Sequence, residues 1–318
     1  MGSMDTLRGS GVVRGRGSRG RRVAVGRRLL AVALALAVTA CGGGSSNNND
    51  TNRTLGDVAF GNGQFVTAGK EGLLFTSSDG QKFVSRHSNI EDTALNGCSG
   101  GPGLLLVVGD DGTIISSADG ITWQAESSGV NVSLQAAIFA NAMVIAVGYQ
   151  GTILTSTDGH AWTPRASGTA AALHGIGVGP LGFVAVGDDG TVVTSADGIT
   201  WTGAVSNTSD TLYNVTFGNG VYVFVGANGT VGRATDPHLW ATARQALPTL
   251  QDIAFANNEF VIVAFFGSIF TSPDAMTFTT QNSSTQNDLR GVAFGNGRWV
   301  AVGVDGIVRS SADAISWK

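Results

Sequence analysis

The sequence contains few of the residues on which many enzymes and metal proteins depend. Its 318 residues include only two Cys, four His and three Tyr. Two cysteines provide neither a disulfide framework nor a paired set of metal ligands. The chain also has no HExxH, GxSxG, P-loop or paired-Cys motif. We therefore expect no metal and no cofactor, and no motif indicates a particular enzyme class.

Basic residues are scarce after position 41. Of the 19 Lys and Arg residues, eight precede Cys41 and 11 follow it, whereas 22 of the 23 Asp and Glu residues follow it. The difference, 11 minus 22, leaves this part of the chain with a net charge near −11. Proteins bind nucleic acid largely by neutralising its phosphates with Lys and Arg. The charge balance therefore excludes nucleic acid as a partner.

Long apolar runs are absent, except for LLAVALALAV at positions 29–38. This run is too short to span a bilayer comfortably. A basic stretch that includes Arg21, Arg22, Arg27 and Arg28 precedes it, and the small residues Thr39 and Ala40 follow it. Basic residues, a short apolar run and small residues in this order are typical of a secretory signal.

The four residues at positions 38–41, VTAC, resemble the lipobox of bacterial lipoproteins. The resemblance implies that Cys41 is lipidated and becomes the mature N-terminus; a buried or disulfide-bonded Cys41 is the alternative. Residues 42–49, GGGSSNNN, are typical of a flexible tether. We expect a lipoprotein signal peptide over 1–40, then the lipidated Cys and a Gly/Ser/Asn-rich tether over 41–54. The protein would then be lipid-anchored to a membrane of the bacterial cell envelope, outside the cytoplasm.

One short motif recurs seven times in the rest of the chain. It is an Asp, usually with a Ser two positions before it, and always with a Trp or Phe four positions after it. The intervals between successive acids are 40, 39, 39, 39, 38 and 39 residues, which indicates a repeat architecture. The seven acids are Asp79, Asp119, Asp158, Asp197, Asp236, Asp274 and Asp313.

Each repeat has the local signals of β-strands. A Leu stands 24 residues before each acid, so this part of every repeat has no insertion or deletion. Asn-Gly pairs such as Asn62 and Gly63 separate two apolar runs, which is a strong hairpin signal. We therefore predict four short antiparallel strands per repeat. The seven leucines are Leu55, Leu95, Leu134, Leu173, Leu212, Leu250 and Leu289.

A four-stranded sheet of this size cannot bury both faces, so neighbouring repeats must stack. Seven copies of about 39 residues match a propeller of four-stranded blades. We predict an all-β fold over residues 55–318, a seven-bladed β-propeller with four-stranded antiparallel blades. The stretch after Trp317 is short for an outer strand, and we expect residues 50–54 to supply that strand and latch the first blade to the last.

We interpret the seven acids as structural. Asp and Ser side chains accept hydrogen bonds from nearby backbone amides in turns, and one active site would not need the same acid in every blade. The aromatic side chain after each acid is expected to pack between blades. Cys98 aligns with Val, Ala and Ile in the other repeats, so we expect a buried apolar side chain, with a catalytic thiol as the alternative.

The motifs SADGITW, STDGHAW and SADAISW, with the FGNG stretches, make the chain similar to Asp-box repeats, also called bacterial neuraminidase (BNR) repeats. Sialidase-like propellers share these repeats, although here the Trp follows the Asp by four positions rather than five. Residues 55–318 more closely resemble bacterial propellers grouped with photosystem II stability and assembly factors. The resemblance implies the fold. We do not carry the photosystem function over to this chain, because a photosystem assembly factor is expected to have a basic patch and this chain is acidic.

The repeats differ most informatively at the position directly after each Leu. In a propeller this residue begins the innermost strand, on the face that also carries the turns between the second and third strands and the connections between blades. We call this face of the propeller the variable face and predict that it binds a ligand. The alternative is that these residues only meet solvent at hairpin ends. Gly56 stands at this position in the first repeat, and the candidate ligand-binding residues are Asn96, Gln135, His174, Tyr213, Gln251 and Arg290.

Two functions remain open at this point. The first is a non-enzymatic, membrane-tethered binding or assembly scaffold, monomeric, which presents the variable face to a protein or glycan partner. The second is a carbohydrate-active enzyme of the glycoside hydrolase kind, for which two carboxylates about 5 to 9.5 Å apart in a cleft would be required. The candidate acids for that chemistry are Glu71, Asp110, Asp111, Asp188, Asp189 and Asp305.

Overall fold

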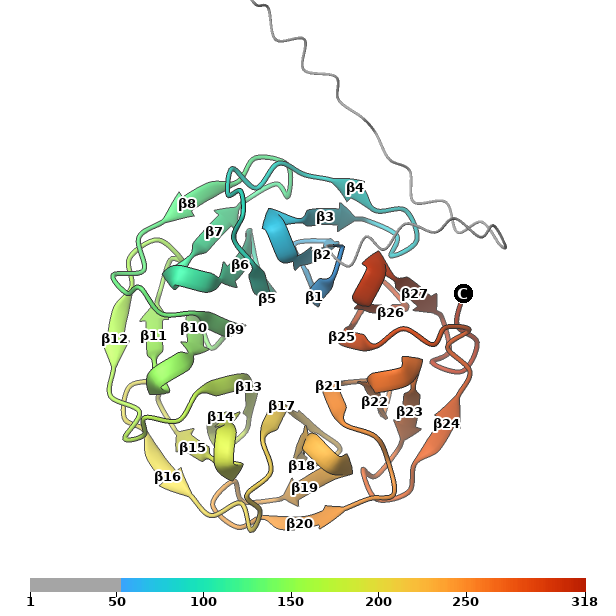
Figure 1. Ribbon diagram of the computed structural model, residues 1–318. Coiled ribbons are helices and arrows are strands. Elements are labelled where there is room, and N and C mark those ends of the chain that lie inside the picture. The colour runs from blue at the N-terminus through green and yellow to red at the C-terminus, as the bar shows by residue number, and fades with distance from the viewer. Residues whose placement is uncertain (1–52) are drawn as a thin grey trace, which may run out of the picture. The chain divides into compact units, whose positions relative to one another are not determined.

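The computed structural model describes residues 53–318, which form a ring of seven antiparallel sheets (Figure 1). In each sheet the strands follow one another in chain order, from the strand nearest the axis to the strand at the rim. Six sheets have four strands and the last has three. The described residues include no helix that is both long and apolar enough to cross a membrane. The predicted seven-bladed all-β propeller is confirmed.

The first four blades have closely similar strand lengths. Blade 1 contains β1 (Leu55–Gly61), β2 (Gln64–Gly69), β3 (Leu74–Ser77) and β4 (Val84–Ser85). Blade 2 contains β5 (Leu95–Gly101), β6 (Leu104–Gly109), β7 (Ile114–Ser117) and β8 (Gln124–Glu126). Blade 3 contains β9 (Leu134–Ala140), β10 (Met143–Gly148), β11 (Ile153–Ser156) and β12 (Thr163–Arg165). Blade 4 contains β13 (Leu173–Gly179), β14 (Gly182–Gly187), β15 (Val192–Ser195) and β16 (Thr202–Ala204).

The remaining blades complete the ring. Blade 5 contains β17 (Leu212–Gly218), β18 (Val221–Gly226), β19 (Thr230–Ala234) and β20 (Ala241–Arg244). Blade 6 contains β21 (Leu250–Ala256), β22 (Glu259–Ala264), β23 (Ile269–Ser272) and β24 (Thr279–Gln281). Blade 7 contains β25 (Leu289–Gly295), β26 (Arg298–Gly303) and β27 (Val308–Ser311). A short 3-10 turn joins the second and third strands of each blade: η1 (Lys70–Gly72), η2 (Asp110–Gly112), η3 (Tyr149–Gly151), η4 (Asp188–Gly190), η5 (Ala227–Gly229), η6 (Phe265–Gly267) and η7 (Val304–Gly306).

The turns use the residues that their backbone angles demand. Asn62 and Gly63, between β1 and β2, have φ of 48° and 76°, the left-handed pair that a tight hairpin requires. In η1 the last residue, Gly72, has φ of 67°, and a Cβ there would lie 1.9 Å from the carbonyl oxygen of Ile90. Only glycine fits such a position, which explains why this turn ends on Gly in every blade.

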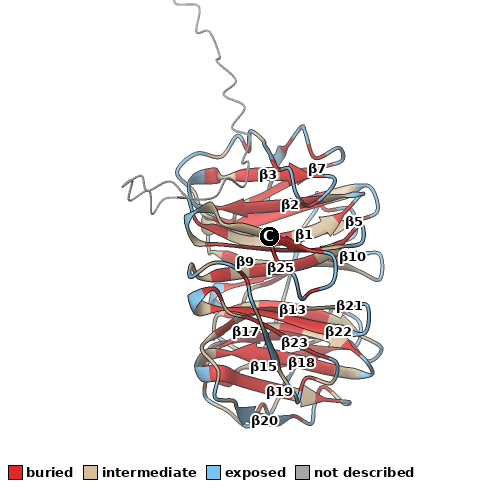
Figure 2. Ribbon diagram, turned by 90° about the vertical axis from the view of Figure 1, so that its right-hand side faces the viewer, coloured by how far each residue is buried: buried red, intermediate tan, exposed pale blue. Residues whose placement is uncertain are grey.

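The hydrophobic core is divided among the seven junctions between blades, and each cluster contains residues of two neighbouring blades. One of them joins Val300 and Val302 of the last blade to Leu55, Phe65 and Phe83 of the first. The strands are therefore largely buried, whereas exposed residues gather in the loops at the two ends of the blades (Figure 2). Stacking closes the ring without leaving an uncovered sheet face.

The repeated acids hold the turn between the third and fourth strands. In blade 1, Asp79 Oδ1 accepts the backbone amides of Gln81 and Lys82, each at 2.8 Å. Ser77 donates its hydroxyl to the same oxygen at 3.0 Å and accepts the amide of Gly80 at 2.9 Å. The two amide bonds to the Asp recur in five other blades. Blade 5 departs from them, because Ala234 replaces the Ser and Asp236 accepts the amide and ring of His238.

The rim of the last blade differs from the others. Lys318 and Ser310 exchange two backbone hydrogen bonds of 3.0 Å, at the place where the fourth strand runs in the other blades. Thr54 belongs to the first blade, because its carbonyl accepts the amide of Lys70, as the carbonyl of Ala94 accepts that of Asp110 in the second blade. Residues 50–52 lie outside the described residues, as do the expected signal segment, Cys41 and most of the tether. The latch therefore stays a prediction.

Candidate functional site

The residue after each repeated Leu is the extra residue of a β-bulge. In blade 1, Leu55 pairs with Gly69 and Asp57 with Ala68, so that Gly56 has no partner in β2. The same shift of register occurs at the start of the innermost strand in all seven described blades. A bulge frees a side chain from the alternation of the strand and re-aims it. The variable column therefore forms a ring at the mouth of the central channel.

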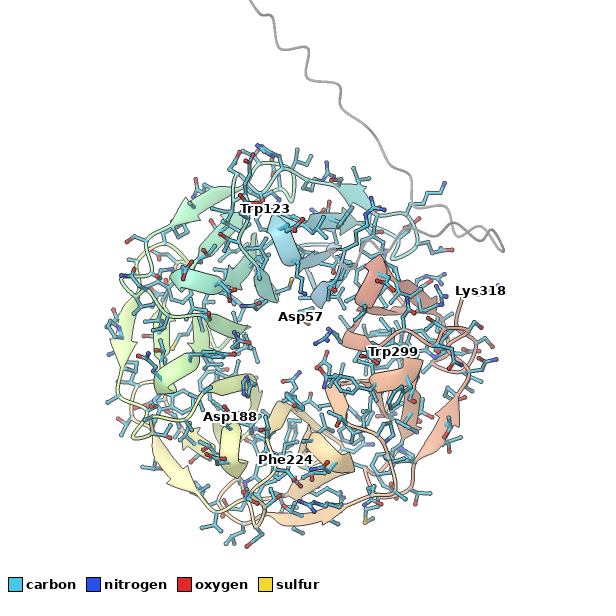
Figure 3. All side chains as sticks on the ribbon, in the orientation of Figure 1. Asp57, Trp123, Asp188, Phe224, Trp299 and Lys318 are labelled. Atoms are coloured by element: carbon cyan, nitrogen blue, oxygen red, sulfur yellow. The ribbon has the colours of Figure 1, made fainter. Side chains whose placement is uncertain are left out.

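His174 and Asp188 form a hydrogen-bonded pair at this ring. His174 Nε2 lies 2.8 Å from Asp188 Oδ1, and the Thr211 hydroxyl donates to the same oxygen at 3.1 Å. The His174 side chain is 16% exposed, whereas that of Asp188 is 43% exposed. Figure 3 labels Asp188 on the turn beside the inner strands of its blade. One carboxylate oxygen is thus held in place by the protein while the group still meets solvent.

Three aromatic rings follow one another around the same sector. Tyr149 and His174 have ring centres 6.2 Å apart in an edge-to-face arrangement. His174 and Tyr213 are tilted, with ring centres 5.9 Å apart. Tyr149 is 46% exposed. Because these residues come from blades 3, 4 and 5, the fold assembles from three repeats an aromatic surface that no single repeat contains.

Arg290 is the bulge residue of the last blade. Its Nε is buried without a hydrogen-bond partner within residues 53–318. Burial raises the pKa of the Tyr213 hydroxyl, the charge of Asp188 raises it further, and the charge of Arg290 lowers it. Arg290 and Asp188 therefore both act electrostatically on the same tyrosine.

The other ring residues make fewer contacts. Asn96 donates its side-chain amide to Asp110 Oδ1 at 2.9 Å and to the carbonyl of Leu134, in the next blade, at 3.0 Å. Gln135 and Gln251 make no side-chain hydrogen bond within the described chain, so their amides remain available at the mouth. The predicted site residues thus do share one face, and the His174 sector is the part in which side chains contact one another.

The six turn acids lie in four turns, which belong to blades 1, 2, 4 and 7. Asp110 and Asp111 lie in η2, Asp188 and Asp189 in η4, Glu71 in η1 and Asp305 in η7. Asp110 is engaged by Asn96 and Asp188 by His174. Five cavities in the described part of the chain are each lined by at most one of these acids. These cavities do not supply the pair of carboxylates that a glycoside hydrolase centre requires.

Two carboxylates at the channel wall, the buried Asp252 and the partly buried Asp57, were not singled out from the sequence. Asp57 accepts the amides of Val58 at 2.7 Å and Cys98 at 2.8 Å, and Asp252 accepts those of Ile253 and Val292, both at 2.7 Å. Each acid therefore joins its own inner strand to that of the next blade. Figure 3 shows Asp57 at the inner edge of the ring. Burial, together with the negative charge of Asp252, raises the pKa of Asp57 to about 7.

Cys98 is 5% exposed, in agreement with the expectation of a buried side chain. Burial first, and then the charge of Asp57, raises the pKa of its thiol well above the ordinary value. A thiol of this kind is a poor nucleophile because the thiolate is the reactive form. The part of the chain that the structure describes contains no group of three or more His, Cys, Asp or Glu side chains arranged to hold a metal ion.

The central channel has a mixed wall. It has a volume of about 380 Å³ and is lined by the innermost strands. Aliphatic side chains such as Val58 and Val215 alternate there with backbone groups and with the polar side chains of Ser99, Asn214 and Thr216. Polar groups are therefore present along the channel as well as at its mouth.

Comparison with known proteins identifies the fold but no family. No protein-family model and no curated protein matches the sequence. Among solved structures, YCF48 bound to D1 peptide is 19% identical, with a TM-score of 0.66 over 81% of this chain and 93% of that one. YCF48 from Cyanidioschyzon merolae is 16% identical, with a TM-score of 0.64 over 82% and 96%. The WD40 propeller domain of Doa1 is 14% identical, with a TM-score of 0.64 over 84% and 96%. At these identities the likeness establishes the propeller fold alone.

Proposed function

We propose that this protein is a non-enzymatic binding or assembly scaffold that holds a protein partner on the variable face of its propeller. One observation carries the proposal. Seven repeats of nearly equal length differ at the bulge residue, and the fold gathers these residues into one ring at the channel mouth. Binding sites commonly use variable residues on a rigid frame.

The contacts in the ring favour binding over catalysis. Asp188, His174 and Thr211 hold one another by hydrogen bonds, and Tyr149 and Tyr213 flank them with partly accessible rings. Tyr is enriched at protein interfaces because it combines a large apolar ring with a hydroxyl. The structure of YCF48 with a D1 peptide demonstrates that a propeller of similar fold binds a peptide, which supports the same class of activity here.

The proposal also includes a location and a second partner class. The lipobox-like residues before Cys41 and the Gly/Ser/Asn-rich segment after it favour a lipid anchor at the bacterial cell envelope. Replacement of Cys41 with Ser should abolish incorporation of labelled fatty acid and move the protein from the membrane fraction to the soluble fraction. Unchanged membrane association would contradict the anchor.

A glycan is the second candidate for the variable face, since Tyr, Asn, Gln and Asp side chains also bind sugars.

Site-specific photo-crosslinking tests the face directly. A photoreactive amino acid is placed at Gln135 or Gln251 on the variable face, and at Ile121 or Ile199 beside the Asp boxes on the opposite face. The two isoleucines are 59% and 46% exposed, which makes them suitable controls. In living cells, we expect the same protein to be cross-linked from both glutamine positions and from neither isoleucine position.

The cross-linked protein is then identified, purified and titrated against the full chain. Replacement of Tyr149 with Ala should weaken its binding by about 3-fold or more, because an interface aromatic residue is removed. Equal cross-linking from both faces, or a Tyr149→Ala variant with unchanged affinity, would reject the variable face as the binding surface. Turnover of a glycan that disappears in an Asp110→Asn or Asp188→Asn variant would replace the scaffold with the enzyme.

A further inference from the structure

The 3-10 turns give the variable face a strongly one-sided charge. Their 21 residues include six acids and a single base, Lys70. The acids are Glu71, Asp110, Asp111, Asp188, Asp189 and Asp305. The described chain as a whole has 11 Lys and Arg against 21 Asp and Glu, a net charge of −10. A partner of opposite charge is attracted to such a surface, whereas an acidic partner is repelled.

Two of these acids, Asp188 and Asp189, lie in the same sector as the aromatic rings. Asp188 is 2.8 Å from His174, whose ring lies between those of Tyr149 and Tyr213. Asp188 Oδ1 is occupied by His174 and Thr211, whereas Oδ2 has no hydrogen bond within residues 53–318. A carboxylate accepts several hydrogen bonds, so this second oxygen is free for a donor from outside.

We propose that the variable face binds a basic peptide segment, with a Lys or Arg side chain seated between Asp188 and the ring of Tyr149. The proposal rests on the proposed function and names the chemistry of its partner. An ammonium or guanidinium group is attracted by an aromatic face within about 6 Å and by a neighbouring carboxylate. Asp189, which follows Asp188 in the same turn and is exposed, adds a second negative charge beside this seat.

Arg290 provides a second, independent way to test the sign of the partner's charge. It is the bulge residue of blade 7 and so belongs to the same ring of residues on the variable face, and its positive charge lowers the pKa of Tyr213. If the bound group is a cation, Arg290 repels it, and removing that charge tightens binding. If the bound group is a carboxylate, Arg290 attracts it, and removing that charge weakens binding. The two ligand chemistries therefore predict effects of opposite direction for one substitution.

The experiment measures fluorescence anisotropy of three labelled peptides with the full chain at pH 8. The peptides share a Gly/Ser backbone and carry four Lys, four Glu or four Gln. We expect the Lys peptide to bind, with an affinity that falls as salt is raised, and the other two to bind much more weakly. Asp188→Asn should lower the affinity for the Lys peptide about 3-fold, and Tyr149→Ala should lower it by a similar factor, whereas Tyr149→Phe should retain binding. Arg290→Gln should raise the affinity for the Lys peptide about 2-fold or more.

Glu259→Gln is the matched control, because it removes one negative charge next to the hairpin between β21 and β22, on the opposite face. We expect it to leave the affinity unchanged. Asp189→Asn is a second test of the same turn, since Asn tolerates the φ of 54° at this exposed position. Thermal melting verifies that each variant is folded.

Three results would overturn the proposal. The first is binding of the Glu peptide that is lost in Arg290→Gln. The second is an equal effect of Asp188→Asn and Glu259→Gln, which would indicate attraction by net charge alone. The third is no binding of the Lys peptide. Each of these leaves the proposed function standing if cross-linking from Gln135 and Gln251 still captures one protein, so the two failures are distinguishable.

Discussion

Asn296 in the last blade donates its side-chain amide to the carbonyl of Ser78, in the Asp box of the first blade, over 3.0 Å. Next to it, the ring of Phe60 from the first blade covers Gly295, where a Cβ would lie 2.0 Å from the ring. Residues 218 positions apart in the sequence thus close the ring. The same two contacts recur at other junctions: Asn62 donates to Ala118, and Phe139 covers Gly101.

Replacing Asn296 with Gly tests the closure of the ring. Glycine suits the φ of 47° at this position but removes the hydrogen bond. We expect the free energy of unfolding in urea to fall by about 1 kcal/mol. The matched control is Asn62→Gly, which removes the bond of 2.6 Å between the first and second blades. We expect similar losses, and a loss confined to Asn62→Gly would show that Asn296 does not contribute to closure.

Asp57 should make the stability of the propeller depend on pH. Its pKa is raised from 3.8 to about 7 in the folded protein, first by burial and then by the charge of Asp252. The folded state therefore holds this proton more tightly than the unfolded state does. The stabilisation is fully present below pH 4 and is lost as the pH rises through about 7. We expect the melting temperature to fall between pH 6 and pH 8.

The control for this effect is Asp57→Asn, which cannot ionise. Its amide oxygen still accepts one of the two backbone bonds from Val58 and Cys98. We expect a lower melting temperature at pH 6, because one buried amide loses its acceptor, and a smaller change between pH 6 and pH 8. A variant with the same pH dependence as the parent protein would show that another group is responsible.

Asp210 should be important for the stability of blade 5. Its carboxylate accepts Nε of Arg244 at 2.7 Å and Nη2 at 2.6 Å, together with the side chains of Asn228 and Thr230. Hydrogen bonds from Arg244 and from these neighbours hold its pKa well below the ordinary value. Because the Asp210 side chain is only 6% exposed, we expect Asp210→Asn to lower the free energy of unfolding by about 2 kcal/mol. Arg244 is 62% exposed, so Arg244→Gln should lower the free energy of unfolding by less than Asp210→Asn does. Urea denaturation of both variants decides the order.

Cys98 should be unreactive in the folded protein. Burial raises the pKa of its thiol, so the reactive thiolate does not form. The side chain is also only 5% exposed, so a reagent cannot reach it. We expect no labelling by a thiol-specific reagent at pH 8 without denaturant and stoichiometric labelling in concentrated urea. Rapid labelling of the native protein would contradict the buried position and reopen a catalytic role for this thiol.

The repeats made much of the fold predictable. The stretch from Leu55 to Asp79 has the same length in every copy, and the structure places three strands and two turns within it each time. The Asn-Gly pairs do form the hairpins between the first and second strands. The bulge at Gly56, and at its equivalents, was not predictable, because it arises from pairing with a strand about ten residues later and leaves no gap in the repeat.

The candidate site was predictable as a column but not as a set of contacts. His174 and Asp188 are 14 residues apart in one repeat, whereas Tyr149 and Tyr213 belong to the repeats on either side. Their proximity depends on how three blades stack around the axis. The roles of Asp57 and Asp252 could not be predicted for the same reason. Each carboxylate accepts a backbone amide from the next blade, and this contact cannot be read from its own repeat.

The sequence by itself determined the number of blades, the position of each turn and a column of mostly polar residues in which the blades differ. Local backbone preferences and a strict period are sufficient for these, because each repeat carries its own hairpin and turn residues. Only the tertiary structure decided that this column sits on bulges and that an aromatic and acidic sector forms across blades 3 to 5. It also decided that Asp57 and Asp252 accept backbone amides from the next blade. These features depend on neighbouring blades, and the charge and burial of a side chain are set by what packs against it rather than by its own repeat.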